Sequence, residues 1–346
     1  MATNLSYIAS QILDAIEESG KDIKDHDLRG IQDEYISFID EYAANSSGCV
    51  YLKVGNHVPN LGKPDAASIS NNERIVIIGD LHSDFEALKG ILLKLICSEY
   101  DYPGKAVFVF LGDYLDRGFK PFQTLRLLFR FRQIIGQRCI FLKGNHDGFY
   151  YNRANEVFYP LVKPADSIEM MFHLFEAETM EKFKIFFDIL PYFVLAQVNE
   201  RFYFITHGGI PKDSLTNQIT FENLHLVRLP FSSKKALQSK VYKALKSLTW
   251  GDPVAIDYFR DQDTVRFEFG SLQFERFKES FGFTHLVRGH EPICTGFQSF
   301  YNEQLFTIFS TGGKGNRTSY YSNLVTEPCF GIIDEEGILK AERIFQ

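Results

Sequence analysis

The 346-residue sequence predicts an α/β fold built from parallel βαβ units, and two observations indicate this class. Between residues 74 and 142, short apolar segments alternate with longer segments in which apolar residues recur at helical spacing. Each apolar segment ends in a turn in which glycine is followed by Asp or Asn. Strands and helices that alternate in this way form parallel βαβ units, because two parallel strands need a crossover connection.

The elements are expected in a regular order. The first three strands are predicted at residues 74–78, 106–111 and 139–142, with helices at 84–98 and 121–136 between them. Residues 148–190 are rich in aromatic residues and are expected to form a mostly helical insertion. The remaining predicted elements are a hairpin at 192–197 and 202–206, helices at 221–247 and 272–281, and strands at 285–287, 296–301, 305–309, 330–334 and 338–345.

The first 70 residues differ from the rest. Residues 5–45 carry apolar stripes at helical spacing and are punctuated at Gly20 and Asp25, so two helices are expected. Residues 54–73 are rich in Gly, Pro, Asn and Ser and are predicted to be loop. We therefore expect residues 1–70 to form an N-terminal helical cap, and residues 71–346 to form one domain with no further boundary.

Composition limits the class of function. The net charge of −7 argues against general affinity for nucleic acid, because phosphate backbones attract basic surfaces. The five Cys are widely spaced without a CxxC pair, which argues against a disulfide scaffold and favours a reducing compartment. Neither a signal peptide nor an apolar run long enough to span a bilayer is visible. A cytoplasmic location and no membrane span are therefore expected, with export into a host cell as the alternative that stays open.

Five apolar strands end in turns that carry Asp, Asn or His. These turns are Gly79-Asp80-Leu81-His82, Gly112-Asp113, Gly144-Asn145-His146, His207-Gly208-Gly209 and Gly289-His290. One such turn often has no ligand, but the carboxyl ends of strands in an α/β sheet share one edge, so five turns bring their side chains together. Oxygen and imidazole ligands without Cys suit Mn, Fe or Zn better than a thiolate zinc site. An Asp shared by two ions would make a two-metal site.

The same turns resemble the signature blocks of the phosphoprotein phosphatase family, within the calcineurin-like metallophosphoesterase superfamily. The matching segments are Gly79-Asp80-Leu81-His82, Gly112-Asp113-Tyr114-Leu115-Asp116-Arg117-Gly118, Gly144-Asn145-His146-Asp147, His207-Gly208-Gly209, Trp250-Gly251-Asp252-Pro253 and Arg288-Gly289-His290. The resemblance covers about residues 74–345. It implies a mixed β-sandwich flanked by helices, in α/β/β/α layers.

The resemblance also implies a role for each matching residue. Two divalent ions, Mn²⁺ first and Fe or Zn as alternatives, would be bound by six residues: Asp80, His82, Asp113, Asn145, His207 and His290. Asp113 would bridge both ions, and Asn145 would also face the phosphate. His146 would protonate the leaving oxygen, Asp116 would orient His146, and Arg117 would bind phosphate. A water that bridges the two metals would attack phosphorus directly.

Two departures from the family concern the phosphate pocket. The position at which the family usually has a second phosphate-binding Arg is Asp263 here. We expect a replacement cation, with Arg260 as the first candidate and Arg228 as a weaker one. The position at which the family often has a pocket Tyr is Lys314, which is the other candidate for a phosphate ligand. The alternative is that these cations are solvated surface charges.

Smaller departures indicate an atypical or bacterial-type branch. Ser83 stands where the family usually has Gly, Asp147 replaces Glu, and Gly289 replaces Ala before His290. The expected function is a metal-dependent protein phosphatase acting on phosphoproteins, with Ser/Thr preferred over Tyr. The alternatives are a hydrolase of dinucleoside tetraphosphates or other small phosphates on the same metal site, and an inactive phosphoprotein-binding module. The sequence names no regulatory partner.

Overall fold

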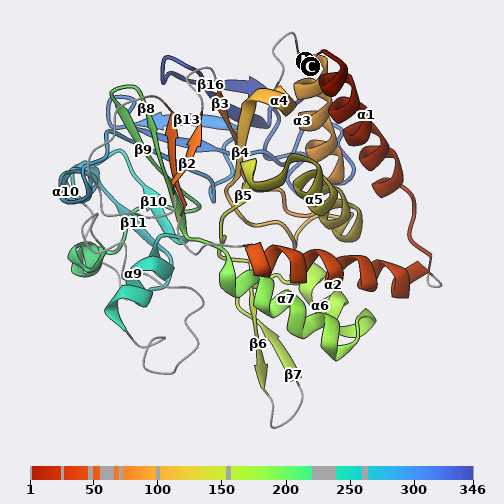
Figure 1. Cartoon of the computed structure of the whole chain (residues 1–346). Coiled ribbons are helices and arrows are strands. Elements are labelled where there is room, and N and C mark those ends of the chain that lie inside the picture. Colours follow the sequence, from red (N-terminus) through yellow and green to blue (C-terminus); the bar gives the residue numbers. More distant parts are fainter. Residues whose placement is uncertain are drawn as a thin grey trace.

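The computed structural model describes most of the chain (Figure 1). The residues outside the description are 1, 25–26, 46–49, 55–65, 70–72, 99–101, 153–156, 220–238, 259–263 and 346. Within the described part, none of the helices is long and apolar enough to cross a membrane.

A five-stranded sheet contains the predicted βαβ units. Its strand order is β16 (Leu339–Arg343), β15 (Cys329–Ile333), β3 (Arg74–Ile78), β4 (Ala106–Phe110) and β5 (Cys139–Phe141). The strands β3, β4 and β5 are parallel, as the alternating pattern predicts, and β15 runs antiparallel to β3. The crossover helices α3 (Phe85–Cys97) and α5 (Pro121–Ile135) lie close to their predicted positions. The carboxyl ends of these three parallel strands therefore lie at one edge.

A seven-stranded sheet packs against the first. Its order is β13 (Phe297–Phe300), β14 (Leu305–Ile308), β12 (His285–Arg288), β9 (Arg201–Thr206), β8 (Phe193–Val198), β1 (Val50–Val54) and β2 (Ala66–Ile69). The prediction of loop over residues 54–73 is wrong where β2 lies, because this short strand pairs in parallel with β1. The strand β1 in turn pairs with β8, so residues from the N-terminal segment extend the seven-stranded sheet.

Alternation along the strands places apolar side chains on both faces of each sheet and gives three apolar layers. Ile75 and Ile77 of β3 face the second sheet and pack in a cluster with Val194, Tyr203 and Ile205. The intervening residues of β3 belong to a second cluster, which lies between the five-stranded sheet and its helices. A third cluster joins the outer face of β8 and β9 to α9 (Lys240–Ser247) and α10 (Ser271–Phe281). The order helix, sheet, sheet, helix confirms the predicted α/β/β/α sandwich.

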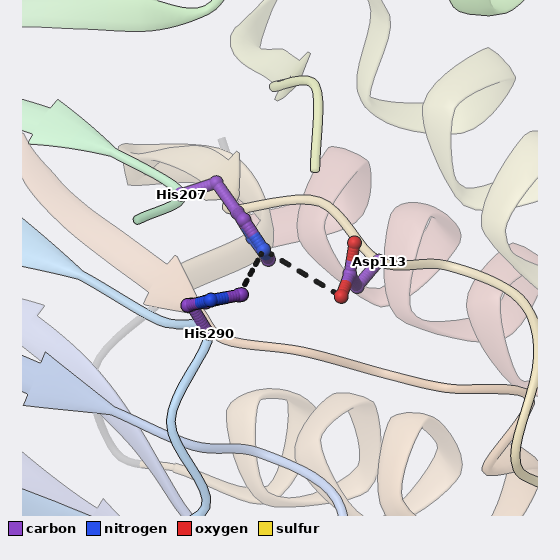
Figure 2. A group of neighbouring side chains, drawn as sticks. All are labelled: Asp113, His207 and His290. Carbon is purple, nitrogen blue, oxygen red and sulfur yellow. Dashed lines mark hydrogen bonds and ion pairs between the residues drawn. The ribbon is translucent and has the colours of Figure 1, made fainter. Parts of the chain in front are cut away.

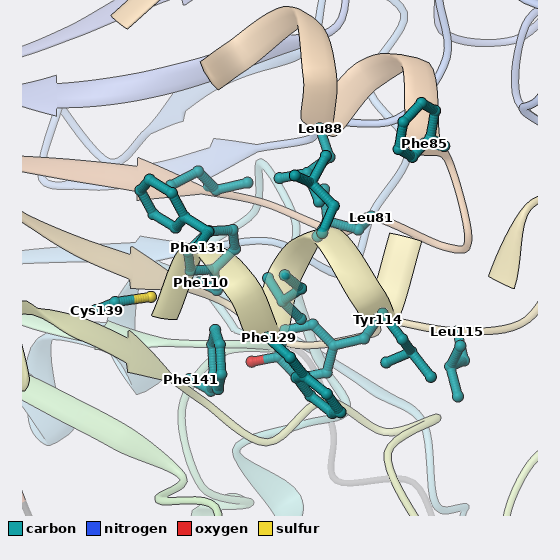
Figure 3. Close-up of a cluster of buried hydrophobic side chains, with 14 of the residues drawn as sticks. Leu81, Phe85, Leu88, Phe110, Tyr114, Leu115, Phe129, Phe131, Cys139 and Phe141 are labelled. Carbon is teal, nitrogen blue, oxygen red and sulfur yellow. The ribbon is translucent and has the colours of Figure 1, made fainter. Parts of the chain in front are cut away.

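Aromatic rings fill the layer between the five-stranded sheet and its helices. Figure 3 shows Phe110 and Phe141 from two neighbouring strands and Phe131 from α5 within one buried cluster. Phe129 stacks on Phe38 of α2 (Leu28–Asn45), with ring centroids 4.0 Å apart. The helices α1 (Ala2–Ser19) and α2 confirm the two predicted N-terminal helices, and both contribute side chains to this core.

The insertion and the region after it differ in part from expectation. The predicted helical insertion over residues 148–190 begins with a hairpin, β6 (Phe149–Asn152) and β7 (Val157–Pro160), before α6 (Asp166–Leu174) and α7 (Ala177–Ile189). The hairpin projects from the body of the molecule in Figure 1. Its Phe149 and Phe158 pack edge to face, and Phe158 stacks on Phe172 of α6, so the aromatic residues of this segment anchor a hairpin where a helix was expected. The predicted helix at 221–247 lies mostly outside the described residues, apart from α9.

Candidate metal centre

The five predicted turns meet where the carboxyl ends of strands from both sheets lie next to one another. Three turns follow β3, β4 and β5, and the other two follow β9 and β12 of the second sheet. The expectation of one edge of one sheet is therefore corrected: two sheets contribute to the site. Five of its non-glycine residues have left-handed backbone, which is uncommon and costs energy: His82, Asp113, Asp116, Arg117 and His290.

Close packing of two turns fixes their residue types. Gly112 has a φ of +111°, and a Cβ at this position would lie 2.3 Å from the backbone nitrogen of Gly144. Only glycine allows the turns after β4 and β5 to approach this closely. As a result, Asp113, the candidate ligand for both metals, lies beside Asn145 and His146. The His146 backbone N–H donates to Asp113 Oδ1 at 2.9 Å.

The first half of the site consists of Asp80, His82 and Asp113, which are all buried. His82 Nε2 lies 3.6 Å from Asp80 Oδ2 and 3.5 Å from Asp113 Oδ2. The other ring nitrogen, Nδ1, lies 3.0 Å from the Leu115 carbonyl oxygen. A carbonyl can only accept, so Nδ1 carries the proton and Nε2 offers its lone pair toward the two carboxylates.

The second half consists of Asp113, Asn145, His207 and His290. Figure 2 shows the side chains of Asp113, His207 and His290 pointing toward one another. His207 Nε2 lies 3.5 Å from Asp113 Oδ2 and 2.9 Å from Asn145 Oδ1. His290 Nδ1 lies 3.0 Å from the same Asn145 oxygen and 3.2 Å from His207 Nε2. The His207 Nδ1–H donates to the Leu111 carbonyl at 3.1 Å, which orients the ring.

The electrostatics of these residues suit cations. Burial lowers the pKa values of His82, His207 and His290 well below their usual range, so the imidazoles stay neutral. Burial raises the pKa of Asp80 to about 7, and it raises the pKa of Asp113 well above its usual range, where the charges of Asp80 and Asp147 add to the effect. Neutral imidazoles and crowded buried carboxylates are the donor set of a divalent transition-metal site.

Unpaired buried atoms give an independent test of that fit. Four side-chain atoms around the centre are buried without a hydrogen-bond partner: Asp80 Oδ2, His82 Nε2, His146 Nε2 and His290 Nε2. An unmet polar atom in a protein interior costs free energy, so several of them in one place indicate a missing ligand. The six residues predicted as metal ligands therefore fit two divalent ions, with Asp113 in both groups.

His146 and Asp116 form a buried pair beside the centre. His146 Nδ1 lies 2.9 Å from Asp116 Oδ2. The other Asp116 oxygen accepts the backbone N–H groups of Ser167 and Ile168, at 3.1 and 3.2 Å, in the first turn of α6. The helical part of the insertion thus fixes Asp116, and Asp116 fixes the ring of His146 so that Nε2 is the free nitrogen.

Asp147, the shorter replacement for Glu, serves the backbone of the site. Its two oxygens accept N–H groups from Asp113 at 2.8 Å, Tyr114 at 3.2 Å and Gly144 at 2.7 Å. These bonds tie the turn after β4 to the turn after β5. The shorter Asp side chain is therefore long enough to bond to both turns.

Sequence reasoning missed Tyr321. Arg117 Nη1 donates to the Tyr321 hydroxyl, and the Tyr321 ring stacks on His82 with centroids 5.4 Å apart. Tyr321 is buried, which raises its pKa to about 12, so the hydroxyl stays protonated. Its sequence position, seven residues after Lys314, gave no signal, because the intervening loop folds back through side-chain hydrogen bonds. Lys314 itself is exposed on that loop.

A second residue that the sequence did not single out is Arg266, just before β11 (Phe267–Phe269). Its Nε donates to Asp252 Oδ2 at 2.6 Å, and the other Asp252 oxygen accepts from the fully buried Arg288 at 2.8 Å. His290 Nε2 lies 3.8 Å from the same Asp252 oxygen. The half-exposed Arg266 is therefore linked to the second half of the site through Asp252. Arg260, Arg228 and Asp263 lie outside the described residues.

Comparison with known proteins agrees with this geometry. Over 278 residues, which are 80% of this chain, the sequence is 26% identical to a protein of Encephalitozoon cuniculi named probable serine/threonine-protein phosphatase. That alignment spans 55% of the relative's length. A solved serine/threonine phosphatase from Saccharomyces cerevisiae, described as similar to human PP5, has the same fold, with a TM-score of 0.64 and 18% identity over 97% of this chain and 95% of that chain. Residues 73–294 match the calcineurin-like phosphoesterase family. The chain belongs to that family.

Proposed function

We propose that this chain is a metal-dependent phosphomonoesterase that removes phosphate from phosphoproteins, with phosphoserine and phosphothreonine preferred. The observation that supports the proposal most is the convergence of two metal-ligand groups that share Asp113 with the His146–Asp116 pair. A phosphate monoester needs cations around its oxygens and a proton for its leaving oxygen, and this site offers both. The name of the Encephalitozoon relative is the support for a protein substrate.

The chain's own residues have separate tasks. Arg117 binds a non-bridging phosphate oxygen through its guanidinium, and Tyr321 holds that guanidinium in place. His146 carries a proton on Nε2 and donates it to the departing oxygen, while Asp116 stabilises the charged ring. Two divalent ions, Mn²⁺ first and Fe or Zn as alternatives, supply Lewis-acid stabilisation of the phosphoryl oxygens and activation of water when bound.

A second cation for the phosphate is part of the proposal. Arg266 donates its Nε–H to Asp252, and the other oxygen of this carboxylate lies 3.8 Å from His290 Nε2, so Arg266 is the first candidate among the described residues. Arg260 and Lys314 remain predictions from the sequence. A dianion that Arg117 and the metals hold still presents an oxygen that a further Arg can bind as a fork.

The test is a substrate panel with added Mn²⁺. Matched peptides carrying phosphoserine, phosphothreonine or phosphotyrosine are compared with a dinucleoside tetraphosphate, and the His146→Asn variant is the control for contaminating phosphatases. The proposal expects the highest kcat/KM on phosphoserine or phosphothreonine. Faster turnover of the dinucleotide supports the small-phosphate alternative, and no turnover of any substrate by a metal-loaded chain supports an inactive binding module.

A further inference from the structure

The carboxylate of Asp84 is buried at the start of α3, next to the metal-ligand turn that follows β3. It caps the helix by accepting the Ala87 backbone N–H at 3.1 Å. Four more donors, all from one distant loop, bond to it: the Thr311 hydroxyl at 2.8 Å, the Gly312 N–H at 3.2 Å, the Asn316 amide at 2.9 Å and the Thr318 hydroxyl at 2.8 Å.

All five donors are neutral groups. A buried carboxylate without a cationic partner is tolerated when several hydrogen bonds satisfy it, and the N-terminus of α3 adds a favourable dipole. Because these bonds come from residues 311–318, Asp84 fixes the conformation of a loop more than two hundred residues away in sequence. Gly312 in this loop has a φ of +126°, and a Cβ there would lie 2.6 Å from the Val325 carbonyl oxygen. The loop therefore has one preferred path.

A directed chain of hydrogen bonds leads from Asp84 to Tyr321. A carboxylate can only accept hydrogen bonds, so the Thr311 hydroxyl is the donor in its hydrogen bond to Asp84. The Ser319 hydroxyl, 2.8 Å from Thr311 Oγ1, must then donate to Thr311. Ser319 Oγ keeps its lone pairs and accepts the Tyr321 backbone N–H at 3.1 Å. Thr311, Ser319 and Tyr321 are all buried, so water does not compete for these bonds.

Tyr321 carries the effect of this chain into the site. Its hydroxyl accepts from Arg117 Nη1, and the Arg117 Cζ atom lies 5.9 Å from the centroid of its ring. The same ring stacks on His82. A second link joins the loop to the Arg117 turn, because the Phe119 N–H donates to the Thr318 carbonyl at 3.0 Å. A shift of the loop would therefore move the Arg117 guanidinium directly, and it would reach His82 only through the ring that stacks on it.

We propose that Asp84 is a positioning residue for phosphate binding, which holds the 311–321 loop and, through Tyr321, sets the position of Arg117. This inference rests on the proposed function, since Arg117 is assigned there as the phosphate ligand. Pre-organisation of this kind strengthens binding because the guanidinium does not have to be ordered when phosphate arrives. Asn at position 84 would break the network, because its amide would meet donor groups that cannot reverse, such as the Gly312 N–H.

The test measures competitive inhibition by orthophosphate, together with kcat, KM and bound metal, in the full chain with p-nitrophenyl phosphate as substrate. Asp84→Asn is expected to raise the orthophosphate inhibition constant and KM by roughly tenfold, as for the loss of one positioned ionic hydrogen bond, with metal content unchanged. Thr311→Val cuts the same chain while Asp84 stays, and should give a smaller rise in the same direction; it serves as the test if Asp84→Asn folds poorly.

Asp334→Asn is the matched control. Asp334 also accepts two backbone N–H groups in a turn, but it follows Ile333, which pairs with Ile75 at the far end of β3 from the metal site. This variant is expected to lower stability without changing the inhibition constant.

A double-mutant cycle separates positioning from general loss of structure. In an Arg117→Ala background, Asp84→Asn should have little further effect on the orthophosphate constant, because its action passes through Arg117. Full additivity of the two changes, or an unchanged constant in the single variant, would overturn the inference. A metal-loaded wild-type chain that hydrolyses no phosphomonoester would instead contradict the proposed function, so the two failures are distinguishable.

Discussion

The Nδ1 atom of His146 lies 2.9 Å from Asp116 Oδ2, and its Nε2 atom is buried without a partner. This pairing leaves one nitrogen free beside two groups of metal ligands. An imidazole held in this way can donate a proton to a leaving oxygen. Its ring keeps the same orientation throughout, because the carboxylate fixes it. This relationship supports proton donation as the role of His146, with the metals bound by other residues.

Replacement of His146 by Asn should therefore slow hydrolysis while metal content stays near that of the wild type. The expected loss of kcat is roughly 10²–10⁴-fold on an alkyl phosphate, the range that general-acid catalysis contributes. On p-nitrophenyl phosphate, whose leaving group needs little protonation, the loss should be much smaller. Equal losses on both esters would argue against a proton-donor role.

Alanine variants of the basic residues should rank the phosphate cations. Arg117→Ala is expected to raise KM and lower kcat, by roughly 10–100-fold in kcat/KM, because an ionic hydrogen bond to phosphate is lost. Arg266→Ala should give a smaller loss of the same kind, whereas the exposed Lys314 serves as the comparison. Arg260→Ala completes the series. If Lys314→Ala alone reproduces the Arg117→Ala loss, Arg266 is not the second cation.

The N-terminal helices should contribute to the stability of the layer that covers the five-stranded sheet. Phe129 of α5 is buried and stacks on Phe38 of α2, so Phe129→Ala should lower the free energy of unfolding by about 3–5 kcal/mol. Leu272→Ala on the exposed side of α10 is the control, expected within about 0.5 kcal/mol of the wild type. Denaturant titration checks both, and a Phe129→Ala effect no larger than that of the control would mean that α2 docks weakly.

Removal of metal should destabilise the chain. Asp80, Asp113 and Asp147 lie together in the interior, where burial raises their pKa values and the charges of Asp80 and Asp147 raise that of Asp113 further. Cations that bind only the folded chain add stability, by about 2.7 kcal/mol at a concentration 100 times their dissociation constant. Chelation is therefore expected to lower Tm by on the order of 5 °C, with recovery on addition of Mn²⁺. An unchanged Tm would indicate that the site was empty before chelation.

The residues that converge as candidate metal ligands could be predicted from sequence because strand ends are local features. Each ligand follows an apolar strand directly, and parallel topology then brings the turns together. His146 and Asp116 were assigned by family resemblance, and their 2.9 Å contact agrees with that assignment. The contribution of a second sheet to the site did not follow from these rules, since pairing between distant strands leaves no periodic signal.

Tyr321, Arg266 and β2 show what local pattern cannot predict. Tyr321 reaches Arg117 because Asp84 holds a loop more than two hundred positions away, an effect of tertiary hydrogen bonds alone. Arg266 is placed by Asp252, across a short pair of strands. The strand β2 lies within a segment rich in Gly, Pro and Asn, and its conformation depends on the neighbouring β1 rather than on its own composition.

The most direct test of the account is the metal content and turnover of Asp113→Ala. Asp334→Asn is the control, because Asp334 directly follows β15 beside the end of β3 that is far from the site. Because Asp113 belongs to both ligand groups, its loss should reduce bound metal below the two ions expected per wild-type chain. Turnover of p-nitrophenyl phosphate should fall by roughly 10³-fold or more, since several kcal/mol of charge stabilisation depend on the metals. Two bound ions with near wild-type turnover in Asp113→Ala would contradict the dinuclear centre.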